Sequence, residues 1–575
     1  MKFVPSWRNA LLALLAAGLL ILAFPDFEYW FLAWVALVPL MWAVERETKL
    51  QKPARTKGIG RIIDSPVTRT FLLGWLFGTA FFFGTCWWLA YAPIHYASIP
   101  WPLAYFLIFI PCVISGIFPG IFAAVLAVLL RRFESQALLA APFVWVFVEF
   151  LRYWLTGNNW NALGYSQVWE PLTMRYASIT GVLGVSFAVV VYNLSAIGLI
   201  LLLTAIGSAV LRKVSGDNDE PKPNDKDPEL VNELKIVALI NDDPHETKNT
   251  LILGGYLVFV FLMMWLTPSY SGNGPVSEVV AVQANVPMSG LDQAKWRQLR
   301  DRQISLAEAE LRNIEDKRRT YSPLVPAGQP QPTTVILPES PMNFMYNDDR
   351  EFQQFVRDFT TRNNVSLLLN SAEPDATNGK YFNSAVMVGP GGNEIAQYDK
   401  IYLLPFGEAV PVPFESLVPA FVGNFSTGRE YDLLPLGDAK AGVMICFESH
   451  FGQLSREYVR NGADAIIEMT NDGYLGPTPV LRQHLANAVF RAVETNRPVL
   501  RVTNVGITAY IDERGNVRDP LPPYSEGTRV WTVSKSDGSQ TFYVKYGDWF
   551  AWLCTAITLA LIIFAIRKKM PAVSN

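Results

Sequence analysis

Long apolar stretches alternate with short polar segments through the first half of the chain and return once near its end. A membrane-spanning helix needs about 20 mostly apolar residues. The stretches that reach or approach this length are 9–24, 29–44, 70–91, 103–130, 137–155, 176–211, 251–267 and 548–566. Half of all residues are hydrophobic and only 17% are charged, which is typical of a membrane protein. The pattern predicts a polytopic α-helical membrane bundle of about eight spans.

Two of these stretches allow a second interpretation. The first follows Lys2 and Arg8, as a signal peptide would, but no cleavage site of small residues follows it. Because a second apolar stretch begins almost at once, we interpret the first as a retained helix. The stretch 176–211 is long enough for one tilted span with an overhang, and its length also allows two. No charged or proline-rich turn divides it, so we predict one span.

The segment between the last two apolar stretches has a different pattern. Short β-rich runs alternate there with helical stretches, and Gly and Pro separate them. Its roughly 265 residues are enough to bury a core of their own. We therefore predict a membrane bundle at 1–274, a globular domain at 275–540, and a final span with its tail at 541–575.

The basic residues of the short loops predict which way the bundle is oriented. Lys and Arg concentrate at 46–69, 131–132 and 567–569. The loops 25–28 and 92–102 contain neither residue. Since basic loops mark the cytoplasmic side, both ends of the chain are predicted to be cytoplasmic and the globular domain to be extracytoplasmic. The charged linker 212–249 is then a cytoplasmic spacer, with a short amphipathic helix near 229–240.

Charge and metal-binding residue types exclude several classes of function. The formal net charge is −3, so the chain has no overall basic field to attract a nucleic acid. The four histidines show no metal-ligand spacing, and the sequence contains no CxxC pair. We therefore expect no metal and no cofactor.

Cys446, in the stretch GVMICFESHF, is the one cysteine of the predicted globular domain. The other three lie in apolar stretches, where cysteine is usually a small apolar filler. Cys446 follows a β-rich run and precedes a predicted helix at 448–462, and reactive groups of α/β folds gather at such turns. A helix N-terminus nearby favours a thiolate. Taken alone, the residue is equally compatible with a buried and inert thiol.

A nucleophilic cysteine needs a base. His450 lies four residues further on, but Cys446 precedes the helix, so the two side chains are not expected to face each other. Two other predicted strands end in charged residues, TTVILPES at Glu339 and the hairpin FNSAVMVGPGGNEIAQYDK at Lys400. If the three strand ends converge, Glu339 removes the thiol proton and Lys400 stabilises the oxyanion that forms when Cys446 attacks a carbonyl.

The segments PES, YDKIYLLPFGE and ICFES, in this order, resemble the Glu–Lys–Cys signature of the nitrilase superfamily. Together with the eight apolar stretches, YDKIYLLPFGEAVP resembles one membrane-bound branch of it, the apolipoprotein N-acyltransferases. Similar fragments cover almost the whole chain, including FPDFEYWFLAWVALVPL, EFLRYWLTGNNWNALGYSQ, VQANVPMSGLDQAKW, NDGYLG, QHLANAVFRAVETNRP and RVTNVGIT.

The resemblance implies a fold and a reaction. The fold is an α-β-β-α sandwich on a membrane bundle in the bacterial inner membrane. The reaction moves an acyl chain from a phospholipid, through a thioester, to the N-terminal amine of diacylglyceryl-cysteine apolipoproteins. Glu408 and Glu448 match the supporting carboxylates of the family, and Trp296 matches an aromatic residue of its active site. We expect a monomer.

The chain also departs from the family pattern. Phe447 stands where a tyrosine is usual, and NDGYLG replaces a more aromatic segment, which leaves Tyr474 and Leu475 as a weaker lid. These changes concern substrate preference more than chemistry. The loop 403–425 carries Phe406, Phe414 and Phe421, which either rest on the bilayer surface or close the core of the domain.

Within the bundle, Glu149 and Arg152 lie one helical turn apart near the outer end of the fifth span. They are expected to form a mutual ion pair, and Arg152 is a candidate to hold a phosphate head group as well. Both interpretations can hold together.

Two other classes of function remain. A membrane-tethered amidase would use the same Glu, Lys and Cys, but it would need only a single anchor. A transporter or scaffold with a degenerate enzyme domain would not need to keep these three residues.

Overall fold

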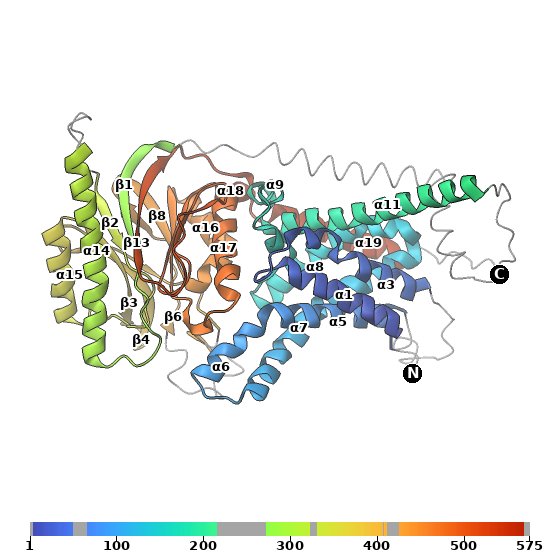
Figure 1. Cartoon of the computed structure of the whole chain (residues 1–575), viewed down its shortest axis with the longest axis horizontal. Coiled ribbons are helices and arrows are strands. Elements are labelled where there is room, and N and C mark those ends of the chain that lie inside the picture. The colour runs from blue at the N-terminus through green and yellow to red at the C-terminus, as the bar shows by residue number, and fades with distance from the viewer. Residues whose placement is uncertain are drawn as a thin grey trace.

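The structure is a computed structural model that describes residues 4–49, 66–215, 272–321, 331–405, 407–410 and 425–567. It is elongated, with a sheet-rich body at one end and a bundle of helices at the other (Figure 1). The first strand begins at Gly272 and the last ends at Ser536, close to the predicted limits of the globular domain. Phe406, Phe414, Phe421 and most of the linker 212–249 lie outside the described residues.

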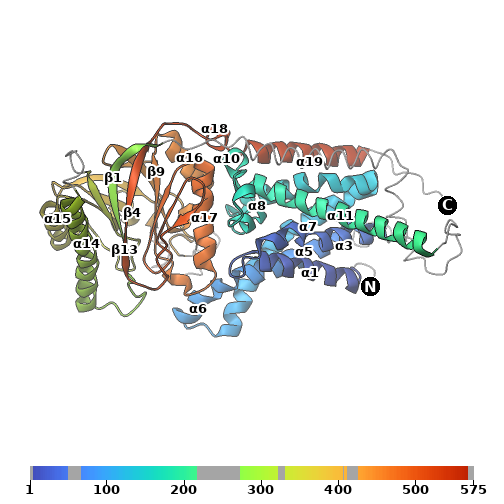
Figure 2. The ribbon, with the colours of Figure 1, turned by 45° about the horizontal axis from the view of Figure 1, so that its top comes forward.

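The helical body is built from apolar helices that pack side by side (Figure 2). They are α1 (Trp7–Ala23), α3 (Val38–Lys49), α5 (Pro66–Cys86), α7 (Trp101–Phe133), α8 (Ala141–Thr156), α11 (Val182–Ser215) and α19 (Trp549–Arg567). Within the described ranges, four helical stretches are long and apolar enough to cross a membrane, namely Pro66–His95, Trp101–Thr156, Val182–Ile200 and Trp549–Arg567. The span predicted at 251–267 lies outside the described residues, so the total of eight stays a prediction.

The apolar stretch 29–44 is not the single helix that its composition predicts. It divides at Leu37, between α2 (Ala33–Ala36) and α3. Asn193, a fully buried residue of α11, lies against the break and accepts a hydrogen bond from the Leu37 N–H at 2.8 Å. Its amide donates to the Ala33 carbonyl, also at 2.8 Å. A buried side chain thus satisfies the backbone groups that the missing helical turn leaves open.

The sheet-rich body contains two stacked sheets. The first has the order β13-β1-β2-β3-β4-β5, and β6 pairs with β4. Its strands are β1 (Gly272–Gln283), β2 (Thr333–Ile336), β3 (Ser366–Asp375), β4 (Lys380–Val388), β5 (Glu394–Asp399), β6 (Phe425–Ser426) and β13 (Gly527–Ser536). β4 and β5 pair antiparallel, which confirms the predicted hairpin.

The second sheet has the order β12-β11-β10-β9-β8-β7. Its strands are β7 (Leu433–Leu436), β8 (Ala439–Ile445), β9 (Ala465–Thr470), β10 (Val499–Thr503), β11 (Ala509–Ile511) and β12 (Val517–Arg518). The central strands β8, β9 and β10 run parallel. They are almost wholly buried, as is usual where a parallel sheet is covered on both faces.

Helices cover the outer faces of both sheets. In Figure 1, α14 (Gln293–Tyr321) and α15 (Arg350–Asn363) lie on the first sheet, and α16 (Gly452–Arg460) and α17 (Val480–Thr495) lie on the second. Alternate residues of β1 serve the two sides: Val279 and Ala281 belong to the core between the sheets, whereas Val280 and Val282 pack under α14 and α15. The body is therefore an α-β-β-α sandwich, as the resemblance implied.

Helix α17 lies between the second sheet and the helical bundle (Figure 2), and all its residues except Arg482 are buried. Arg482, near its start, forms an ion pair with Glu28 of the bundle. The side chain of Gln483 accepts a hydrogen bond from the Trp160 indole and donates to the Thr85 carbonyl, both at 2.9 Å. The sandwich is thus joined to the bundle through the helix that also backs its second sheet.

Candidate active site

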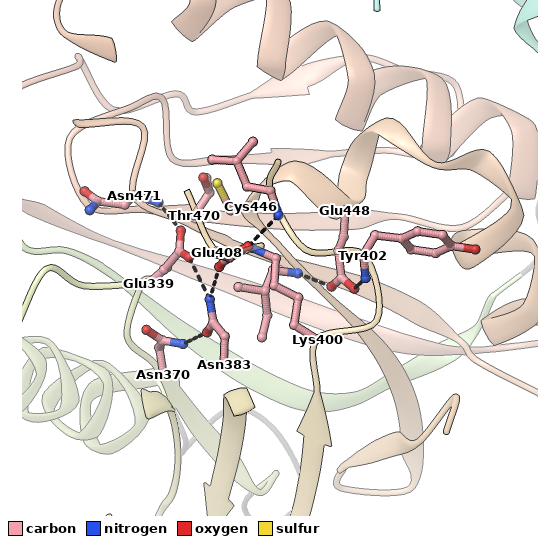
Figure 3. Close-up of polar contacts among 12 residues, drawn as sticks. Glu339, Asn370, Asn383, Lys400, Tyr402, Glu408, Cys446, Glu448, Thr470 and Asn471 are labelled. Carbon is pink, nitrogen blue, oxygen red and sulfur yellow. Dashed lines mark hydrogen bonds and ion pairs between the residues drawn. The ribbon is translucent and has the colours of Figure 1, made fainter. Parts of the chain in front are cut away.

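Three strand ends meet between the two sheets. Glu339 follows β2, Lys400 follows β5 directly, and Cys446 follows β8 directly. All three line one cavity, whose empty volume, counted up to the open solvent, is about 810 Å³. The Lys400 ammonium nitrogen lies 4.0 Å from a carboxylate oxygen of Glu339, and Figure 3 shows the Cys446 sulfur in the same cluster. The structure brings together the three residues that the sequence placed at separate strand ends.

The backbone at Cys446 is strained. Its φ of 54° lies in the left-handed region, which residues other than glycine rarely adopt. The residue opens the short 3₁₀ turn η7 (Cys446–His450), and α16 begins only at Gly452. The helix predicted from 448 is therefore replaced by a turn and a shorter helix. A sharp, strained turn after a strand is a common way to present a nucleophile.

Burial in the cluster raises the pKa of the Cys446 thiol well above its usual range, and the negative charge of Glu339 adds to this effect. Lys400 acts in the opposite direction but does not outweigh them. The thiol is therefore protonated at rest, and the favourable effect that a helix N-terminus has on a thiolate does not prevail. A nucleophilic role of Cys446 therefore requires a base that removes the thiol proton.

Two hydrogen bonds hold the Glu339 carboxylate in the cavity. One carboxylate oxygen accepts the Asn471 N–H at 3.1 Å, and the other accepts the Asn383 side-chain amide at 3.3 Å (Figure 3). Burial raises the pKa of Glu339 and the nearby Glu408 adds to the rise, whereas Lys400 opposes it. A carboxylate with a raised pKa is a stronger base than one in water.

The acylation rate should consequently rise with pH through the raised pKa of Glu339. Below that pKa the carboxyl group is protonated and cannot accept the thiol proton, so the rate is low; above it, the rate levels off. We expect the midpoint in single-turnover acylation to lie above pH 4.5, the ordinary value for a glutamate. A rate that is independent of pH across this region, or that falls, would contradict the assignment of Glu339 as the base.

Lys400 is almost fully buried, with 1% of its side chain exposed, and is paired with Glu408. Its Nζ lies 2.8 Å from the carboxylate of Glu408, which also accepts the Leu404 N–H at 2.8 Å. Burial disfavours the ammonium form, but Glu408 and Glu339 outweigh it and raise the pKa of Lys400. The lysine therefore keeps a positive charge inside the cavity, next to the sulfur.

Glu448 connects the segment around Lys400 to the turn around Cys446. One oxygen accepts the N–H groups of Ile401 and Tyr402, at 2.7 and 3.0 Å. The other accepts the Ile445 N–H at 2.8 Å. Burial raises the pKa of Glu448 to about 7, although Lys400 and these hydrogen bonds oppose the rise. Glu448 thus holds the segments that carry Lys400 and Cys446 in position relative to each other.

His450 does not act on the thiol. Its Nε2 accepts the backbone N–H of Asn159, in the bundle, at 2.9 Å. Its ring lies between those of Phe447 and Trp160, at centroid distances of 5.7 and 5.4 Å. The imidazole is turned toward the bundle, in agreement with the sequence argument against a Cys–His pair.

Of the other predicted site residues, some line the cavity and some pack beside it. Tyr474 lines the cavity, and its ring packs edge-on against that of Tyr96 at 6.2 Å. Leu475 packs against the apolar cluster of Cys86, Trp88, Val480 and Leu481. The Phe447 ring packs edge-on against that of Phe451 at 5.2 Å. The structure thus brings Tyr474 to the cavity and leaves the side chains of Leu475 and Phe447 in neighbouring apolar contacts.

Trp296 lies in the outer layer, where its ring packs against Phe344 and Phe352. Its indole N–H donates to the Met342 carbonyl at 2.9 Å, in the loop that follows Glu339. It therefore reaches the site through the backbone of that loop.

Arg152 and Glu149 do not form the expected ion pair. Among the described residues, the Arg152 guanidinium donates to the Trp160 carbonyl and to the Asn159 side chain, both at 3.0 Å. Glu149 accepts the Leu163 N–H at 2.7 Å. Each side chain binds the loop after α8 instead of the other, because that loop offers unpaired backbone groups in an apolar setting. A role of Arg152 with a phosphate stays a prediction.

Several residues of the site were missed by the sequence analysis. Asn383 and Asn471 donate to Glu339, and four charged residues lie buried close behind Cys446: Glu468, Asp472, His484 and Arg501. Asn471 and Asp472 directly follow β9, so the rule that identified Glu339, Lys400 and Cys446 also points to them. Within the described part of the chain, no three His, Cys, Asp or Glu side chains are arranged to hold a metal ion.

Residues 332–542, which include most of the sandwich, match the family model "Carbon-nitrogen hydrolase". Residues 16–195 match a second model, "Apolipoprotein N-acyltransferase N-terminal domain". The chain belongs to the apolipoprotein N-acyltransferase family.

Relatives of that name match over nearly the whole length. The protein of Geobacter metallireducens is 29% identical, over 98% of this chain and 96% of its own. That of Allorhizobium ampelinum is 28% identical, over 97% and 96%. Among solved structures, Nit3 of Saccharomyces cerevisiae, a member of the nitrilase superfamily, is 17% identical and covers 46% of this chain and 93% of its own, with a TM-score of 0.33.

Proposed function

We propose that the protein transfers an acyl chain from a phospholipid to the N-terminal amine of diacylglyceryl-cysteine apolipoproteins. The convergence of Glu339, Lys400 and Cys446 in one cavity carries this proposal. The similarity of the whole chain to proteins named apolipoprotein N-acyltransferase supports the choice of donor and acceptor. The reaction completes the maturation of lipoproteins.

The first half of the reaction forms a thioester. Glu339 takes the thiol proton while the Cys446 sulfur attacks the ester carbonyl carbon of the phospholipid. The oxyanion that develops lies beside the Lys400 ammonium, which stabilises it. The ester C–O bond then breaks, and the lysophospholipid leaves with the proton that Glu339 returns.

The second half repeats these roles with an amine. The N-terminal amine of the apolipoprotein attacks the thioester carbonyl, and Glu339 accepts the amine proton. When the C–S bond breaks, the sulfur of Cys446 takes that proton and the amide product is released. The thioester divides one difficult transfer into two easier ones, provided that water is kept from the cavity.

The surroundings of the cavity suit a donor embedded in a bilayer. Tyr474 lines the cavity and contacts Tyr96, which directly follows the bundle helix α6 (Tyr91–His95). Further along, Trp101 and Phe106 of α7 are 67% and 60% exposed, as expected for side chains that face lipid. We place the bundle in the bacterial inner membrane, with both ends of the chain cytoplasmic, the sandwich outside and a single copy as the working unit.

The experiment that tests this function uses cells depleted of their own N-acyltransferase. We expect the wild-type gene to restore growth, and the purified protein to convert a diacylglyceryl lipopeptide to its N-acylated form when given phospholipid. Glu339→Gln should do neither. A purified protein that releases ammonia from small amides but transfers no acyl chain would be an amidase, and rescue by Glu339→Gln would exclude a catalytic role of that residue.

A further inference from the structure

The four charged residues close behind Cys446 form a closed network. Arg501 binds Glu468 at 2.5 Å and Asp472 at 2.7 Å. Asp472 also binds Nδ1 of His484 at 2.6 Å. The side chains of all four residues are at most 6% exposed. None of them lines the cavity that holds Cys446, yet the network contacts the nucleophile at one point.

That contact is made by His484. Its Nε2 lies 3.0 Å from the carbonyl oxygen of Cys446 and 3.2 Å from the Glu468 carboxylate. Both ring nitrogens therefore face oxygen acceptors, and the protonated ring offers an N–H to each side. Burial opposes this charge and Arg501 adds to the opposition, but Asp472 and Glu468 outweigh them and raise the pKa of His484. The ring donates to the Cys446 carbonyl.

The direction of the Cys446 carbonyl also fixes the direction of the Phe447 N–H. The C=O of Cys446 and the N–H of Phe447 belong to one planar trans peptide and point in opposite directions. A hydrogen bond from His484 to the carbonyl thus directs the Phe447 N–H away from the charged network. It also holds Cys446 at its strained φ of 54°, which the residue would not keep without support.

We propose that His484 is a positioning residue for acyl transfer: it fixes the Cys446–Phe447 peptide so that the Phe447 N–H joins Lys400 in stabilising the oxyanion. The identity of the acyl substrate rests on the proposed function, whereas the contact between His484 and the Cys446 carbonyl does not. The position of His484 is fixed by its neighbours in α17, because Arg482 and Gln483 bind the bundle directly. Docking of the bundle and the direction of the nucleophile's peptide are thereby linked through consecutive residues.

The test separates oxyanion stabilisation from thiol reactivity. Acylation of Cys446 by p-nitrophenyl butyrate passes through an oxyanion, whereas its alkylation by iodoacetamide does not. We expect His484→Ala to lower the acylation burst by about 100-fold, the usual effect of losing one oxyanion donor, and to leave alkylation nearly unchanged. His484→Gln keeps a side-chain N–H donor and should regain much of the burst. Cys446→Ser supplies the background for both reagents.

A matched control comes from the same helix. Glu494 is also buried and pairs with Arg491 at 2.8 Å, but it binds the backbone of Val182 in the bundle instead of the nucleophile. Glu494→Gln should lower thermal stability without changing the ratio of acylation to alkylation. If acylation and alkylation fall together in His484→Ala, or if neither falls, the proposal is wrong. A wild-type protein that reacts with the nitrophenyl ester but not with phospholipid would refute the proposed function and leave this test intact.

Discussion

We expect Cys446→Ala to form no acyl-enzyme at all, and Glu339→Gln to form it roughly 10²- to 10⁴-fold more slowly, the range typical for loss of a general base. In the proposed mechanism the Cys446 sulfur attacks the carbonyl, so its removal leaves no route to the thioester. In Glu339→Gln the neutral amide still fits between Asn383 and Asn471, but it cannot accept the thiol proton. Because the pKa of the thiol is raised, few molecules carry a thiolate without the base.

The measurement uses phospholipid with a labelled acyl chain. Label that stays on the wild-type protein after denaturation, and that hydroxylamine releases, identifies a thioester. Cys112→Ala, in the buried part of α7, is the matched control and should be labelled like the wild type. Label on the Cys446→Ala protein, or label that resists hydroxylamine, would show that the acyl chain is carried elsewhere.

The central site was predictable because each of its members ends a strand. Glu339, Lys400 and Cys446 each follow a β-rich run that is visible in the sequence. β2 and β5 belong to the first sheet and β8 to the second, so the stacking of the two sheets brings the three strand ends together. The hairpin of β4 and β5 was equally local, since GPGG marks its turn.

What remained hidden depends on partners far apart in the chain. The helix break at Leu37 is stabilised by Asn193, 156 residues away, and no local pattern around Leu37 indicates it. His484 reaches Cys446 from the first half of α17, 38 residues further on. A helix N-terminus beside Cys446 was expected to favour a thiolate, whereas the fold places a 3₁₀ turn and the buried carboxylate of Glu339 there. Long-range packing decided all three outcomes.

We expect replacement of Lys400 to have the second large effect. Because Lys400 forms a buried ion pair, its effect on stability can be measured separately from its effect on acylation. In Lys400→Met, Glu339 and Glu408 lose the positive charge between them while Asn383 still holds both carboxylates close together. Breaking a buried pair in this way typically costs about 3–5 kcal/mol of unfolding free energy. We therefore expect a clear fall in the melting temperature of the detergent-solubilised protein, together with loss of the acylation burst.

The double variant Lys400→Met/Glu408→Gln distinguishes the two roles. Removing both members of a buried pair often restores stability, so its melting temperature should return most of the way to that of the wild type. Its acylation burst should stay absent, because no ammonium remains beside the developing oxyanion. Recovery of the burst along with stability would mean that Lys400 only neutralises its two carboxylates. Loss of the burst in a stable double variant requires instead that the charge of Lys400 acts on the transition state.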